Sequence, residues 1–293
     1  MIITTLVVTM VAVLVGAAAL IHQQSSSHTA SSADVPAFPS ASSSRSVPTA
    51  TTQRGPQQVA ALGEHPLSTD RNAGLFDIAC PYAPWGPQAD QARRFYESAL
   101  TCMNEAWSTV MSQKLLPFSE PKLEVPTLAA LASSPCTSSS SRSFAAFYCP
   151  TNRTIYMPMD TIGIDRYGSD SVIYLGTLAH EYGHHVQTIS GISSEANVKR
   201  WIFGEGAEGE LEMSRRLELQ AQCFAGMFFT AAYDSMTPDQ YTRALSDRSG
   251  RGDYHGDARD HGSPTNNGDW VQRGAKNSLA ECNTWNAPAN SVS

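Results

Sequence analysis

The stretch Ala-His-Glu-Tyr-Gly-His-His-Val-Gln, residues 179–187, decides how the rest of the chain is interpreted. It contains the pattern H-E-x-x-H, in which His180 and His184 stand four residues apart and Glu181 follows the first histidine. On a helix, residues at i and i+4 project from one face, so the two imidazoles are placed to bind one metal ion. Glu181 then lies beside a water on that metal, where a carboxylate can take up its proton. The pattern predicts a metal site on a helix.

The residues around this motif indicate that it does lie on a helix. Apolar residues recur at helical spacing from Val172 to Ile189. Ser-Asp-Ser at 169–171 can cap the start of the helix, and Gly191 can end it. Gly183 is a poor helix former, so we expect its missing side chain to let another backbone or a substrate approach the metal closely.

A zinc site of this kind needs a third protein ligand, and Glu218 is the best candidate. It lies within Arg-Arg-Leu-Glu-Leu-Gln-Ala-Gln-Cys-Phe-Ala-Gly, residues 215–226, where apolar residues again recur at helical spacing. An ordinary ion pair with Arg215, three residues earlier, is the alternative for Glu218. Because the first motif requires a carboxylate from a second helix, we predict one Zn²⁺ ion held by the two histidines and Glu218.

These segments resemble the bacterial neutral zinc metallopeptidase family. Further blocks that match run from Cys136 to Cys282-Asn283-Thr284, so the resemblance covers roughly residues 75–285. The family implies a zincin-like α+β domain, mostly helical with a small antiparallel or mixed sheet, that hydrolyses peptide bonds. It also implies that His180, His184 and Glu218 bind the zinc and that Glu181 is catalytic.

Two positions depart from the family's pattern. Gln222 stands where the family has Asp, an acid that in such enzymes accepts a hydrogen bond from a ligand histidine. Its uncharged oxygen can still accept that bond, so we expect weaker zinc affinity. Asn267 stands where the family usually has Arg; if that Arg holds an oxyanion or a substrate carboxylate, the role is missing or relocated in this chain. A peptidase remains our prediction, and the alternative is a catalytically silent zincin domain that acts as a cell-surface binding or scaffold module.

A second donor should stabilise the oxyanion that forms when water attacks the scissile carbonyl. His261 is our first choice, because its His-Gly-Ser turn belongs to a block that matches the family; a solvent-exposed loop histidine is the alternative. We expect Tyr182 to face the core and His185 to serve packing or hydrogen bonding. Residues 153–157 alternate as a strand, and we predict an edge strand that either pairs with an extended substrate or binds nothing.

Six cysteines and no Cys-x-x-Cys pair argue against a metal site made of cysteines. The even count in an exported chain favours three disulfides, although spacing alone leaves many pairings open. We predict the pairs Cys80–Cys102, Cys136–Cys149 and Cys223–Cys282. The first two are local, and the family resemblance supports the second. Buried, reduced thiols of a cytosolic protein are the alternative, and the N-terminus argues against it.

The chain divides into three parts. Residues 1–24 include an uncharged apolar run long enough to span a bilayer, which predicts a signal peptide or a transmembrane anchor. Residues 25–74, rich in Ser, Thr and Pro, predict a flexible linker. Residues 75–293 form the expected zinc metallopeptidase domain. We therefore expect a location outside the cytoplasm, either membrane-anchored or secreted.

Coarse periodicity also predicts further elements of this domain, and charge limits its partners. The expected elements are helices near 88–113, 238–247 and 265–279, short strands over 122–158, a break at 204–209, and a loop at 249–263. The net charge is −7, with no basic patch, which argues against a nucleic-acid partner. The expected partner is a peptide or protein substrate, and the sequence leaves the oligomeric state open.

Overall fold

The computed structural model describes residues 61–137 and 146–293. The expected signal or anchor segment and residues 25–60 of the expected linker lie outside the described residues. Among the residues that are described, no helix is both long and apolar enough to cross a membrane.

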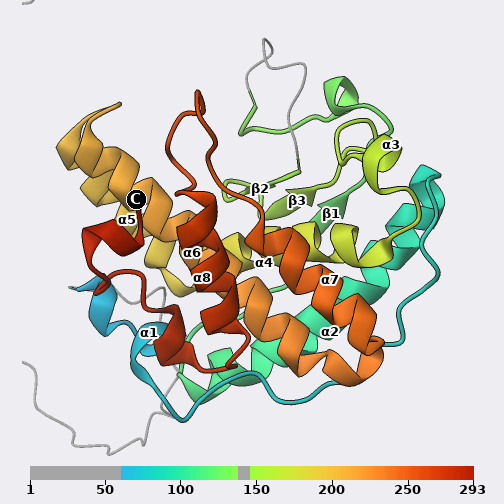
Figure 1. Ribbon diagram of the computed structural model, residues 1–293, viewed down its shortest axis with the longest axis horizontal. Helices are drawn as coiled ribbons and strands as arrows, with labels where there is room; N and C mark the ends of the chain where they lie inside the picture. Colours follow the sequence, from blue (N-terminus) through green and yellow to red (C-terminus); the bar gives the residue numbers. More distant parts are fainter. Residues whose placement is uncertain (1–60, 138–145) are drawn as a thin grey trace, which may run out of the picture. The chain divides into compact units, whose positions relative to one another are not determined.

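Helices make up most of the described fold (Figure 1). Their bounds are α1 Pro66–Thr69, α2 Ala89–Gln113, α3 Ile164–Tyr167, α4 Ser171–Ser190, α5 Ile192–Phe203, α6 Glu208–Ala231, α7 Pro238–Ser249 and α8 Pro264–Gly274. Short 3-10 turns lie at Leu62–Glu64, Ala129–Leu131, Tyr233–Ser235, Leu279–Cys282 and Ala289–Ser291. The helices expected at α2, α4, α6 and α7 are confirmed. Helix α8 ends at Gly274 rather than near 279, and α5 was not expected.

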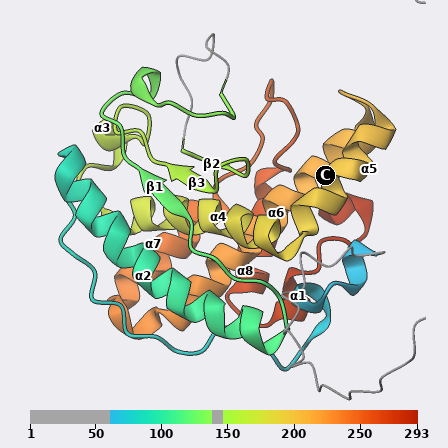
Figure 2. The ribbon, with the colours of Figure 1, turned by 180° about the vertical axis from the view of Figure 1, so that it is seen from behind.

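Helices α4 and α6 form the centre of the fold and pack against each other. Helix α6 also packs on α5 and α8, and α4 on α7. Helix α2 packs on the side of α4 away from α7. Helix α7 lies in front in Figure 1, and α2 lies in front in Figure 2, which shows the opposite side. Helix α4 ends where expected, with Gly191 in the left-handed conformation at φ 93°. A helix enclosed on so many sides needs apolar residues around most of its circumference, as α4 has.

A small mixed sheet completes the α+β fold that was predicted. Its strands are β1 (Lys122–Glu124), β2 (Phe147–Cys149) and β3 (Thr154–Tyr156), in the order β1-β3-β2. The expectation that residues 153–157 form an edge strand is wrong, because β3 pairs in parallel with β1 and antiparallel with β2. Alternation within residues 153–157 cannot show that β1, from an earlier part of the chain, will pair with the second edge of β3. Strand β2, not β3, is the strand that packs beside α4 most closely.

The three disulfides have the predicted pairing. They join Cys80 to Cys102, Cys136 to Cys149, and Cys223 to Cys282. The first joins the segment before α2 to that helix, and the second joins the segment before β2 to the end of β2. The third joins α6 to the 3-10 turn Leu279–Cys282. The two cysteines of the third pair are 59 residues apart in sequence, so this disulfide attaches the C-terminal segment to the central helix α6.

The folded domain begins earlier than the expected boundary at residue 75. In residues 61–74, His65 and Leu67 are fully buried. The backbone N–H of Leu279 donates to the carbonyl of Ala73, so this segment lies against the C-terminal part of the chain. Its short, Pro-containing sequence carries no periodic pattern. Its burial depends on partners some two hundred residues away in sequence, such as Asn283, which donates to the carbonyl of Gly63.

Candidate metal centre and active site

Three donor atoms from α4 and α6 lie at one point. His180 Nε2 and His184 Nε2 are 3.2 Å apart, and each lies 3.2 Å from Glu218 Oε2. In a tetrahedral site with Zn–N and Zn–O bonds of about 2.0–2.1 Å, donors lie about 3.3–3.4 Å apart. The three side chains therefore fit a zinc ion that keeps a fourth position open. The structure thus brings together the three residues predicted to bind the metal, and Arg215 forms its ion pair with Glu208 instead of Glu218.

A close approach of the two helices brings the carboxylate to the histidines. At Gly183, an added Cβ would lie 2.9 Å from the Cα and 3.0 Å from the carbonyl oxygen of Ala221. Ala221 lies one turn after Glu218 on α6, so the missing side chain of Gly183 lets the ligand-bearing helices touch beside the site. The structure shows the close backbone approach that we expected of Gly183.

Hydrogen bonds orient one of the two ligand rings. His184 Nδ1 lies 3.0 Å from Oε1 of Gln187, which leaves Nε2 facing the other donors. The amide of Gln187 donates in turn to the carbonyl of Leu217 and to Gln220, both on α6. Gln187 thereby fixes the ring of His184 and joins the two helices, as residues around metal ligands commonly do. His180 Nδ1 is buried without a partner among the described residues.

Gln222 does not make the hydrogen bond that was expected of it. Its Oε1 accepts from Nε of Arg248 on α7, at 3.0 Å, instead of from a ligand histidine. Asn267 is buried on α8 and donates to the backbone carbonyl of Arg248. Both departures from the family's pattern therefore hold the same arginine. Arg248 gave no signal in the sequence, because nothing in α7 shows which neighbours will surround its side chain.

Glu181 lies beside the ligands, almost completely buried, and burial raises its pKa to about 7 in the metal-free chain. Such a pKa suits a group that both accepts and returns a proton near neutral pH. Burial also lowers the pKa of His180 to about 3. Burial opposes charge on His184 too, but the carboxylate of Glu218 outweighs it and raises the pKa of His184 to about 9.

Two cavities meet at these residues. Their volumes are about 530 and 280 Å³, and both are lined by Ala146, His180, Glu181, Glu218 and His261. Four residues of α4 are not buried, and apart from Ser171 at its first turn they lie on the side facing the cavities. Thr177 lines the larger cavity, and His184 and Thr188 the smaller. An extended ligand can therefore occupy both sides of the metal position.

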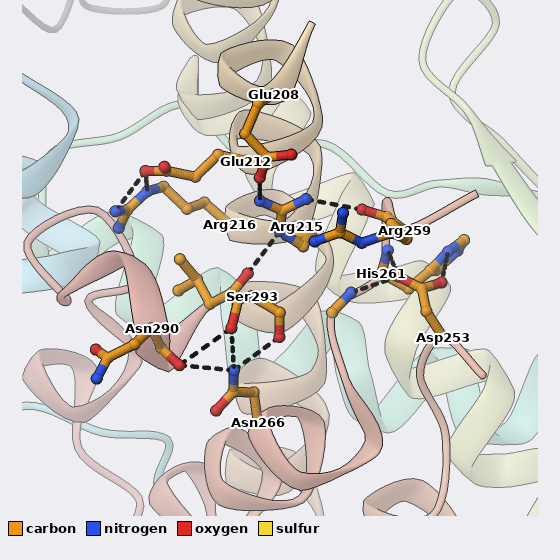
Figure 3. Close-up of polar contacts among 12 residues, drawn as sticks. Glu208, Glu212, Arg215, Arg216, Asp253, Arg259, His261, Asn266, Asn290 and Ser293 are labelled. Carbon is orange, nitrogen blue, oxygen red and sulfur yellow. Dashed lines mark hydrogen bonds and ion pairs between the residues drawn. The ribbon is translucent and has the colours of Figure 1, made fainter. Parts of the chain in front are cut away.

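His261 reaches the site from the loop between α7 and α8, as predicted. Its Nε2 lies 3.9 Å from Glu218 Oε2, and its side chain is 56% exposed. Asp253 accepts from the backbone N–H groups of His261 and Gly262, which fixes the turn (Figure 3). Partial burial opposes protonation of His261, but Glu218 and Asp260 raise its pKa in the metal-free chain.

Arg215 attaches this loop to α6, as Figure 3 shows. It is almost completely buried, and it donates to Glu208, to the carbonyl of Arg259 in the loop, and to the carbonyl of Val292. Because Arg215 lies one turn before Glu218, the same helix fixes both a metal ligand and the loop of His261.

Comparison with known proteins agrees with this geometry. The family described as "Putative neutral zinc metallopeptidase" matches residues 82–285. The chain belongs to this zinc metallopeptidase family. It is similar to the "Uncharacterized protein YpfJ" of Escherichia coli (strain K12), with 30% identity over 146 residues, 48% of this chain and 49% of that protein. It is also similar to the "Uncharacterized protein Rv2575" of Mycobacterium tuberculosis (strain ATCC 25618 / H37Rv), with 30% identity over 199 residues, 64% of this chain and 61% of that protein. The chain thus spans less than two thirds of these relatives, and no solved structure matches it.

The other candidates near the motif serve the core, as expected. Tyr182 is buried, and its hydroxyl donates to Asn104 on α2, away from the cavities. His185 is fully buried; its Nε2 lies 2.7 Å from the carbonyl of Ser119, and its Nδ1 lies 3.1 Å from the hydroxyl of Tyr148. Neither side chain lines the two cavities, which leaves His261 as the candidate donor.

Proposed function

We propose that this chain is a zinc-dependent peptidase that acts outside the cytoplasm. The observation that carries the proposal is the set of three donors at mutual distances of 3.2 Å, with the buried carboxylate of Glu181 beside them in a cavity open to substrate. Family membership supports zinc as the metal and the peptide bond as the target.

The residues divide the chemistry among them. Bound zinc supplies a Lewis acid that lowers the pKa of water and polarises a carbonyl. Glu181 accepts the proton of the attacking water and returns it to the leaving amine, for which its place in the cavity beside the three donors suits it. His261, at the edge of the cavity, donates a hydrogen bond to the oxyanion. His180, His184 and Glu218 hold the metal in place.

The location outside the cytoplasm rests on two independent features. Three disulfides join all six cysteines, a pattern that persists in oxidising compartments. The apolar run within residues 1–24 is long enough to direct export or to anchor the chain. We propose that the partner is a peptide or protein substrate outside the cytoplasm. If the N-terminal segment is retained, it attaches this chain to a membrane.

The test compares zinc content and peptide cleavage in the full chain. Glu181→Gln keeps the shape of the side chain but removes the base, so we expect bound zinc to stay near one ion per chain while casein turnover falls roughly 10²–10⁴-fold. Glu218→Gln should instead lose the zinc, and a chelator should abolish turnover by the wild type. Glu205→Gln, an exposed residue near the start of α6, is the control.

The alternative, a silent zincin domain, gives a different result in the same assay. Zinc would bind to the wild type, no peptide in a random library would be cleaved, and Glu181→Gln would be indistinguishable from the wild type. That outcome would refute the proposed peptidase while leaving the metal site intact.

A further inference from the structure

Arg248 is a buried arginine without a carboxylate partner. Its residue is 5% exposed, and its Nε donates to the uncharged amide of Gln222. Among the described residues, its two terminal nitrogens have no hydrogen bond or ion pair. Buried charges are normally paired, because removing a guanidinium from water without compensation is costly. By contrast, Arg251, just after the end of α7, forms an ion pair with Asp247.

The side chain of Arg248 is fixed by its surroundings. Its aliphatic part fills the space that Gly176 leaves on α4, where an added Cβ would lie 2.8 Å from Cδ of Arg248. Gln222 holds the Nε from α6, and Asn267 donates to the backbone carbonyl from α8. Three helices therefore position one guanidinium, and little conformational entropy remains to be lost when a ligand binds.

The guanidinium lines the larger cavity together with Glu181 and Glu218. Gly176 lies one turn before His180, and Gln222 lies one turn after Glu218, so Arg248 is about one helical turn, roughly 5 Å, from the metal ligands along both helices. This separation corresponds to about one residue or two of an extended peptide.

Among the acidic residues of this cavity, Glu181 and Glu218 attract the charge of Arg248 but form no hydrogen bond or ion pair with it. Three others are engaged elsewhere. Asp253 accepts from two backbone N–H groups, Asp257 accepts from the backbone N–H of Tyr254, and Asp260 lies against His261. All three lie on the loop before α8, and Asp257 is exposed, where solvent and salt screen its charge. The guanidinium therefore lines the cavity without a direct carboxylate partner among the described residues.

We propose that Arg248 binds a carboxylate of the substrate close to the scissile bond. The planar guanidinium matches a carboxylate through two parallel hydrogen bonds, and its two unpartnered terminal nitrogens supply the donors. The carboxylate belongs either to the C-terminus of the peptide or to an Asp or Glu side chain near the cleaved bond. Asn267 occupies the position where the family usually has Arg, and in this chain it holds Arg248 in place.

This inference rests on the proposed function, so its test measures binding separately from cleavage. The full chain carrying Glu181→Gln is titrated calorimetrically with short alanine-rich peptides, both zinc-loaded and metal-free. The peptides form matched pairs: a free or amidated C-terminus, and Asp or Asn, or Glu or Gln, at each internal position. Charge-assisted hydrogen bonds should make one class of carboxylate peptide bind roughly tenfold more tightly or better than its amide partner. The class that gains identifies the source of the carboxylate.

Arg248→Met in the same background should remove this preference, since Met keeps the aliphatic volume against Gly176 and loses the charge. Arg243→Gln, at an exposed arginine of α7 that lines neither cavity, is the matched control and should retain it. The thermal midpoint and zinc content of each variant show whether it is folded. Arg248→Lys, which keeps the charge without the fork, should retain a reduced preference and serves if Arg248→Met does not fold.

The possible outcomes separate the two proposals. Equal affinity for every acid and amide pair, or a preference that persists without the guanidinium, overturns the role of Arg248 even if the wild type cleaves peptides. A preference that depends on Arg248 supports the carboxylate site even if no peptide is cleaved, because it is measured in a chain without the base.

Discussion

His65 shows how one buried residue ties the stability of the domain to pH. Its ring is fully buried, with Nδ1 accepting from the backbone N–H of Leu67 and Nε2 at 3.3 Å from the carbonyl of Ser190. These contacts use the neutral ring, and burial lowers its pKa to about 4. In the unfolded chain the pKa is about 6.5, so between these values the unfolded state binds more protons. The contribution of His65 is therefore present above about pH 6.5 and is lost as the pH falls toward 4.

We expect His65→Gln to lower the free energy of unfolding near neutral pH and to reduce its decline in acid. Urea unfolding of wild type and variant at about pH 7 and about pH 5 measures this, and the difference between the two proteins should shrink at the lower pH. Taking the difference removes the contribution of His180 and His184, which both proteins share. A difference that stays constant or grows in acid contradicts the assignment.

At the residue scale, the sequence predicted the groups whose spacing carries information. The H-E-x-x-H pattern itself points to His180, Glu181 and His184. Glu218 could be predicted because that pattern supplies only two of the three ligands a zinc site needs. The partners of Gln222 and His65 could not be predicted in this way. Gln222 meets Arg248, and His65 meets Ser190, only after separate helices have packed. The family resemblance marks Gln222 as unusual, but it does not predict that Arg248 is the side chain that Gln222 contacts.

Helices α4 and α6 make a prediction about Gly183. Ala is the better helix former by about 1 kcal/mol, so in an unpacked helix Gly183→Ala would stabilise the chain. Here the new Cβ would lie 2.9 Å from Cα of Ala221, which is backbone and cannot move without separating the helices. We expect a net loss of about 1–3 kcal/mol in the free energy of unfolding, as for other overpacked cores, and weaker zinc affinity, because Glu218 moves with α6.

Urea unfolding and competition with a zinc chelator measure the two effects. Gly250→Ala, at the C-terminal end of α7, is the control, since its φ is −84° and its Cβ would meet no atom nearer than 3.6 Å. This control should leave stability and zinc affinity close to those of the wild type. Unchanged zinc affinity in Gly183→Ala would show that the close contact is not needed to position the carboxylate.

At the scale of elements, the helices with a continuous apolar pattern were predicted and α5 was not. Helix α5 buries Ile192 and Ala196 but exposes Val198, Trp201 and Ile202, so its apolar residues do not form one stripe toward the core. The sheet order also escaped prediction. The pairing of β1 with β3 is non-local, and no pattern within residues 153–157 distinguishes a central strand from an edge strand.

At the scale of the whole molecule, composition and cysteine count indicated one disulfide-bonded domain with acidic charge, and the three disulfides agree with it. The start of the domain was placed too late. Residues 61–74 show no periodic pattern, and their burial depends on contacts with the C-terminal segment, such as the hydrogen bond from Asn283 to Gly63. A boundary set by contacts across the whole chain is not visible in local composition.

The boundary makes a prediction about shortened chains. A chain that begins at residue 61 keeps the buried side chains of Leu62 and Leu67 and the hydrogen bonds of His65, whereas one that begins at 75 loses all of them. Each buried Leu contributes about 1.5–3 kcal/mol. We therefore expect the shorter chain to unfold at least about 3 kcal/mol more easily in urea.

The cost should also reach the metal site. Ser190, which faces His65, closes the helix that carries both histidine ligands, and Gln220, which contacts Ser68, lies next to the turn of Glu218. Removal of residues 61–74 exposes these contacts to water, so the chain beginning at 75 should bind zinc more weakly than the chain beginning at 61. If both chains unfold at the same urea concentration, residues 61–74 contribute nothing to the fold and belong to the linker.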